Sequence, residues 1–107
     1  MISQEQADAA LAQAAREFTE MSYDELGLLD NRLPRSPEDE WRELPPIAVG
    51  GEKFHVHLLI GKIGWFRRRF SVEMVLNSQD RTQWPRVPCV YFERFKSGRL
   101  YVARTKG

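Results

Sequence analysis

The chain of 107 residues carries 16 Lys and Arg against 15 Asp and Glu, is 42% hydrophobic and has one cysteine. This length and hydrophobic share indicate one domain with one core, and the single cysteine excludes an internal disulfide framework and a cysteine-rich zinc fold. No apolar run approaches the ~20 residues of a membrane-spanning helix, and the N-terminus lacks the pattern of a secretory signal, so we expect a cytoplasmic protein with no membrane contact.

The net charge of +1 hides a division of charge along the chain. Residues 1–46 hold 4 Arg and 11 acidic residues, a net charge of −7, whereas residues 47–107 hold 12 Lys and Arg and 4 acidic residues, a net charge of +8. Either the acidic part lies on the basic part and neutralises it, or each part presents a field of one sign to a partner. Neutralisation within the molecule is the simpler interpretation.

The acidic part, residues 1–46, is predicted to form three helices, over about 4–21, 23–30 and 37–44. The first two follow the capping boxes Ser3-x-x-Gln6 and Ser22-x-x-Glu25, in which two side chains satisfy backbone groups at the start of a helix. The third begins at Ser36-Pro37, which places proline in the first helical position. Pro45-Pro46 should end it, because proline cannot continue a helix.

The basic part, residues 47–107, is predicted to form strands near 53–61, 65–77, 88–95 and 99–105. Gly50-Gly51 is a hairpin turn, so residues 47–49 are a candidate fifth strand at the edge. Apolar side chains alternate with polar ones along these strands, which indicates a sheet with one face on a core. The residues expected to be buried are Phe18, Met21, Phe54, Val56, Leu58, Ile60, Phe70, Val72 and Met74.

Helices first and strands second is the arrangement of an α+β fold. We expect the N-terminal helices to pack on one face of an antiparallel meander of four strands, or of five with the edge strand. The last hairpin should place Val90, Phe92 and Tyr101 on one face and Tyr91, Phe95, Leu100 and Val102 on the other. Apolar groups on both faces require a cover, either from curvature of the sheet or from a second subunit.

His55 and His57 lie two residues apart on one predicted strand and so share a face, as metal-chelating His-x-His pairs do. A catalytic zinc needs a third protein ligand, and without another histidine Cys89 or Glu73 would have to serve. We therefore predict no metal site and no cofactor. Cys89 has no evident base and orienting group, and neither a phosphate-binding loop nor a carboxylate pair stands out. The sequence favours binding over catalysis.

The run from Ile63 to Phe70 is distinctive because it holds three successive arginines. If Phe66 and Phe70 face the core, Arg68 shares their face. Trp65, Arg67 and Arg69 then point away from it. A lone buried guanidinium is costly, so Arg68 should reach an edge, lie at a bulge or pair with a helix carboxylate. The candidate carboxylates are Glu38, Asp39, Glu40 and Glu43.

Two functions fit the arginines and aromatic residues of the basic part. Tryptophan, tyrosine and arginine are typical of hot spots in protein interfaces, whereas arginines for phosphates and aromatics for stacking are typical of nucleic-acid-binding sheets. The candidate binding residues are Trp65, Arg67, Arg69, Arg94, Lys96, Arg99 and Tyr101. We expect a small non-enzymatic binding domain that acts through protein-protein contacts, as a homo-oligomer or with another protein. The alternative is a nucleic-acid-binding protein that uses the Arg-rich sheet.

Overall fold

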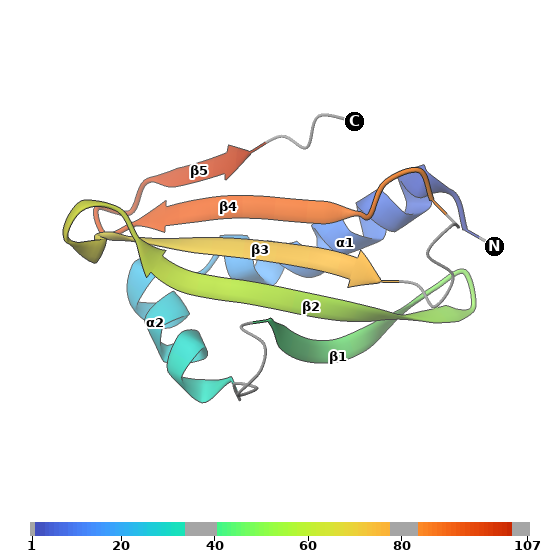
Figure 1. Ribbon diagram of the computed structural model, residues 1–107, viewed down its shortest axis with the longest axis horizontal. Helices are drawn as coiled ribbons and strands as arrows, with labels where there is room; N and C mark the ends of the chain where they lie inside the picture. Colours follow the sequence, from blue (N-terminus) through green and yellow to red (C-terminus); the bar gives the residue numbers. More distant parts are fainter. Residues whose placement is uncertain (1, 34–40, 78–83, 104–107) are drawn as a thin grey trace.

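The computed structural model describes residues 2–33, 41–77 and 84–103. Within them lie α1 Gln4–Thr19, α2 Tyr23–Arg32, β1 Arg42–Val49, β2 Glu52–Ile63, the 3-10 turn η1 Trp65–Arg67, β3 Arg69–Asn77, β4 Cys89–Phe95 and β5 Leu100–Ala103. The strands form one antiparallel sheet in the order β1-β2-β3-β4-β5, with both helices on the same face (Figure 1). The predicted α+β fold is confirmed, in its five-stranded form. Neither described helix has the length and apolar character needed to cross a membrane.

Both helices start at the predicted capping boxes. The Ser3 hydroxyl accepts a bond from the Gln6 amide (3.1 Å) and the Gln6 side chain accepts one from the Ser3 amide (2.9 Å). The Ser22 and Glu25 pair repeats this arrangement at the start of α2. These local bonds fix where each helix begins, because they satisfy amides that have no partner within the helix.

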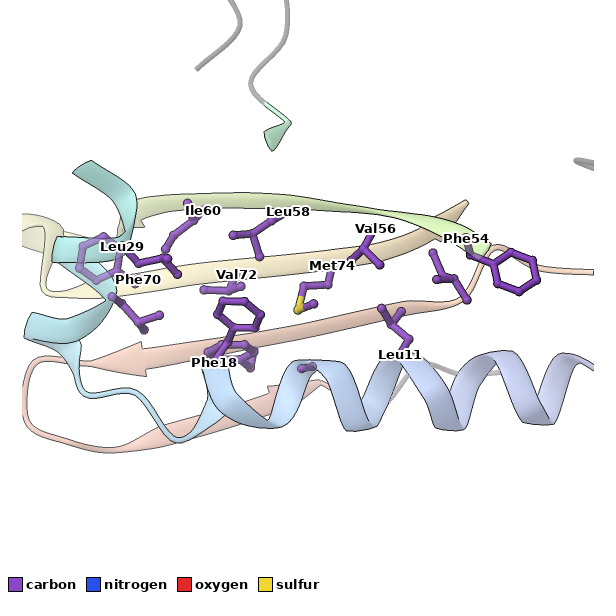
Figure 2. Close-up of a cluster of buried hydrophobic side chains, with 14 of the residues drawn as sticks. Leu11, Phe18, Leu29, Phe54, Val56, Leu58, Ile60, Phe70, Val72 and Met74 are labelled. Carbon is purple, nitrogen blue, oxygen red and sulfur yellow. The ribbon is translucent and has the colours of Figure 1, made fainter. Parts of the chain in front are cut away.

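The core lies between the two helices and the inner face of the sheet (Figure 2). Leu11 and Phe18 of α1 point toward the sheet, and Leu29 of α2 points into the same layer. The buried sheet residues are Phe54, Val56, Leu58, Ile60, Phe70, Val72, Met74, Leu76 and Phe92. The predicted core is confirmed, with Met21 only partly buried at its margin. Each such side chain removed from water contributes roughly 1.5–3 kcal/mol, so this layer is the main source of stability.

The prediction of a helix over 37–44 was wrong at its C-terminal end. Residues 37–40 lie outside the described residues, whereas Arg42–Leu44 belong to β1 and pair with β2. Pro45 and Pro46 lie within this edge strand, where the register shifts between Leu44 and Ile47. An edge strand tolerates proline because a missing amide N–H facing solvent breaks no ladder bond. The sheet therefore begins at Arg42, before the predicted boundary at residue 47.

The predicted faces of β5 were also wrong. The hairpin closes with a hydrogen bond from the Phe95 amide to the Arg99 carbonyl (2.8 Å). Its turn is therefore residues 96–98, one residue shorter than the predicted turn over 96–99. A shift of one residue exchanges the two faces of a strand. Leu100 and Val102 therefore share the helix side with their partners on β4, and Tyr101 lies on the open face opposite Glu93.

Candidate binding surface

One end of the sheet gathers most of the predicted binding residues. There the segment that connects β2 to β3, residues Gly64–Arg68, lies beside the segment that connects β4 to β5, residues Lys96–Arg99 (Figure 1). We call these two segments the turn end. The Lys96 amide donates to the Arg68 carbonyl at 2.8 Å, so the two turns are joined by a backbone bond.

Two aromatic side chains project from the turn end. Trp65 is 84% exposed and Phe66 76% exposed, and their rings meet edge to face with centroids 5.6 Å apart. The strand predicted over 65–77 begins only at Arg69, so its alternation does not extend into the turn and Phe66 does not face the core with Phe70. Phe66 has a φ of 59°, a strained conformation for a bulky residue, and its exposed side chain takes no part in the core.

One cation of the turn end lies beside the aromatic pair, and a second lies beside Phe95. The Arg68 guanidinium lies 5.5 Å from the centre of the Phe66 ring, and that of Arg99 lies 5.7 Å from the Phe95 ring. Among the residues that the structure describes, no carboxylate lies within ion-pair distance of Arg68, Lys96 or Arg99. An open cleft of about 550 Å³ lies between the turns, lined by Arg68, Phe95, Lys96 and Ser97. The turn end is thus both cationic and aromatic.

The other predicted binding residues lie in three different settings. Arg67 belongs to η1, within the turn end. Arg69 lies on the open face of the sheet, where its Nε is 3.0 Å from Glu93 Oε1 and its guanidinium is 5.5 Å from the Phe95 ring. Tyr101 is exposed on the same face.

Arg94 has a supporting position instead. It donates to the Gly98 carbonyl at 2.7 Å and to the Thr19 carbonyl at the end of α1. It therefore ties the β4–β5 turn to the end of α1.

Of the predicted carboxylate partners of Arg68, only Glu43 lies among the described residues, and it forms no ion pair with Arg68. Glu43 lies on β1, 3.4 Å from His55 Nδ1, whereas Glu38, Asp39 and Glu40 lie outside the described residues. Arg68 is exposed, so its guanidinium keeps contact with water and needs no buried counter-ion.

The centre of the open face is acidic and provides no activated nucleophile. Burial, followed by the hydrogen bond to Glu73 and its charge, raises the pKa of Cys89 to about 11. Burial, followed by the charge of Glu93, also raises the pKa of Tyr91. A thiol with so high a pKa is protonated at neutral pH and is a poor nucleophile.

The two histidines have protein partners on the open face. His55 lies beside Glu43, and His57 Nδ1 accepts a bond from the Asn77 amide nitrogen at 2.6 Å. In residues 2–33, 41–77 and 84–103 no three His, Cys, Asp or Glu side chains form a group that could hold a metal ion. A small cleft of about 210 Å³ borders His57, lined by Trp41, His57, Val75 and Asn77.

The tryptophans show why composition alone did not identify the surface. Trp84 packs against the core and donates its indole N–H to the Ile2 carbonyl at 3.2 Å, and Trp41 is half-buried, so neither resembles the exposed Trp65.

Phe66 and Arg68 were not among the predicted binding residues. The signal in the sequence that could have placed them in a turn is Gly64, because glycine readily adopts the positive φ, here 87°, that ends the alternation of β2. No protein-family model, curated protein or solved structure matches this chain.

Proposed function

We propose that this protein is a non-enzymatic interaction domain that binds an acidic segment of a partner protein with its turn end. The observation that carries the proposal is the exposure of Trp65 and Phe66 on a strained turn, beside cations without a carboxylate partner among the described residues. Large aromatics exposed without a packing role typify binding surfaces, and aromatic and arginine side chains dominate the energy of protein interfaces.

The chemistry of the turn end defines the partner. Arg68 and Arg99 present planar guanidinium groups that match carboxylates in two bonds each, and Lys96 adds a third charge beside them. Trp65 and Phe66 offer apolar surface to a neighbouring side chain. A segment that carries acidic residues next to an apolar one therefore fits this surface.

Nucleic-acid binding through the sheet is the alternative, and the geometry supports it less. Phosphates would have to cross an open face where Glu73 and Glu93 occupy the centre and Arg69 is paired with Glu93. The cations and aromatics of the turn end fit single-stranded nucleic acid in principle, so the experiment must separate the two. A cytoplasmic location and a homo-oligomeric state remain predictions from the sequence.

A photo-crosslinking experiment tests the proposal. A photoreactive phenylalanine analogue replaces Phe66 in the full chain, which is expressed in cells. The matched control carries the same analogue at Val87, an exposed apolar position just before the first residue of β4, at the end of that strand away from the turn end. We expect crosslinks to protein from position 66, resistant to nuclease, and none from position 87. Crosslinks that nuclease removes would favour the nucleic-acid alternative, and equal crosslinking at both positions would contradict a specific surface.

A further inference from the structure

The two edges of the described sheet differ in chemistry. At the β1 edge Pro45 and Pro46 lack an amide N–H and the register is interrupted, which blocks further pairing. At the β5 edge, Leu100–Ala103 contains no proline and no charge. Leu100, Tyr101 and Val102 are 40%, 52% and 51% exposed. An uncharged, apolar, exposed edge is the kind that accepts another strand.

The backbone of β5 directs hydrogen-bonding groups to this edge. Phe95 and Arg99 form a hydrogen-bonded pair, and hydrogen-bonded and non-bonded pairs alternate along an antiparallel ladder. In the observed register, Tyr101 therefore bonds with Glu93, whereas Leu100 and Val102 belong to non-bonded pairs. Their N–H and C=O groups point away from β4, and no described strand lies beyond them.

The helix layer does not extend over β5. Leu100 and Val102 lie on the helix side of the sheet, yet both are exposed, because α1 packs against β3 and β4. A strand added beyond β5 with apolar side chains on that side would cover them. The backbone of the same strand would form hydrogen bonds with the outward N–H and C=O groups of Leu100 and Val102.

We infer that β5 accepts an extended peptide segment of the partner as a sixth, antiparallel strand, apolar at alternate positions and acidic at its C-terminal end. β5 runs away from the turn end, so a strand antiparallel to it runs toward the turn end. Its C-terminal residues then lie beside Arg99 and Lys96, whose positive charges have no carboxylate partner among the described residues. The acidic end of this inference rests on the proposed function, whereas the strand addition rests on the edge itself.

The test uses a fluorescent ten-residue peptide with the full-length protein. In the probe, six alternating threonines and valines precede four glutamates, and in the control peptide the four glutamates come first. We expect the probe to bind and the control to bind at least about fivefold more weakly in fluorescence anisotropy, because only the probe brings its carboxylates to the turn end. Equal affinity for the two peptides would contradict the inferred direction.

Variants of the edge separate strand addition from simple charge attraction. Val102→Pro removes an outward N–H without breaking the bonds to β4, and should lower the affinity for the probe peptide about tenfold. Val102→Thr keeps the N–H and should bind the probe as the wild type does. Thermal unfolding verifies that both variants are folded. Should Val102→Pro not fold, peptides methylated at alternate amides serve instead, since only one of the two alternating sets should abolish binding.

Charge variants keep the inference and the proposed function distinguishable. The double variant Lys96→Glu with Arg99→Glu should lower the affinity for the probe peptide. The control Lys53→Glu, at an exposed position on the other end of β2, should leave that affinity unchanged. Loss of binding in the charge variants alone, with Val102→Pro unaffected, would overturn strand addition and leave the turn end as a binding surface. Self-association of the free protein in sedimentation equilibrium, abolished by Val102→Pro, would assign the edge to a second copy and overturn the inference.

Discussion

Arg42 illustrates how one buried charge joins two layers. Its side chain is 3% exposed, and it donates to the carbonyl of Asp30 at 2.5 Å and to the carboxylate of the same residue. The contact fixes the last turn of α2 to the first residue of β1. A guanidinium satisfies helix-end carbonyls and a carboxylate at once, which a neutral side chain of this length cannot do.

Replacing Arg42 tests this contact. We expect Arg42→Ala to lower the free energy of unfolding by about 3 kcal/mol, because it removes a buried guanidinium together with its bonds to the carbonyl and the carboxylate of Asp30. Urea denaturation measures the change, with Lys53→Ala as an exposed control that should stay within about 0.5 kcal/mol of the wild type. Equal stability of the two variants would show that Asp30 finds another partner.

Cys89 provides a chemical readout of the acidic open face. Because Glu73 raises the pKa of the thiol by accepting its hydrogen bond and by its charge, Glu73→Gln should lower that pKa, although burial still holds it above the ordinary value. The thiolate fraction at pH 8 then rises, and alkylation by iodoacetamide should become several-fold faster. Glu52→Gln, on β2 away from Cys89, should leave the rate unchanged, and an unchanged rate in Glu73→Gln would contradict the contact.

At the level of the elements, α2 contains a glycine that its geometry does not require. A Cβ added at Gly27 would meet the Phe70 ring at 3.6 Å, an ordinary contact. Gly27→Ala should therefore raise the free energy of unfolding by about 0.5–1 kcal/mol, because alanine loses less backbone entropy in a helix. Gly50→Ala should destabilise instead, since Gly50 has a φ of +58° and the new Cβ would lie 2.7 Å from Ile2. Thermal unfolding of both variants measures the opposite signs.

Elements with local signals were predictable, and those that depend on distant pairing were not. The capping boxes placed α1 and α2, and alternation placed β2 and most of β3. Residues 42–46 have no strand pattern in the sequence, since Pro45 and Pro46 interrupt it. They belong to a strand only because β1 pairs with β2. The candidate binding residues come from composition, which could not place Phe66 and Arg68 beside Trp65 at the turn end, since a one-residue difference in a turn decides which way a side chain points.

For the whole molecule, the division of charge does not act as an electrostatic clamp in the described contacts. Arg69 pairs with Glu93 within the basic part, and Arg86 and Asp8, which join the two parts, are 3.9 Å apart and nearly half-exposed. Exposed pairs at this distance contribute little. Among the described contacts, burial of the apolar layer and the Arg42–Asp30 contact, and not attraction between the two parts, therefore hold the helices on the sheet.

Salt dependence tests this conclusion. Raising the NaCl concentration from about 0.05 to about 0.5 M shortens the screening length from about 14 to about 4 Å, yet we expect the Tm to change by no more than about 2 °C. Asp8→Asn should change the free energy of unfolding by less than about 0.5 kcal/mol. A steep fall in Tm with salt would instead favour neutralisation between the two parts.

The unequal edges of the sheet also determine where assembly stops. A sheet that is open on both sides can recruit strand after strand, as cross-β fibrils do. Here the prolines of β1 close one side, so whatever pairs with β5 consumes the open side of the described sheet. Each copy of the protein therefore has one open edge in the described sheet and cannot be paired on both sides, as every chain of a fibril is, so copies cannot stack into a fibre through β5.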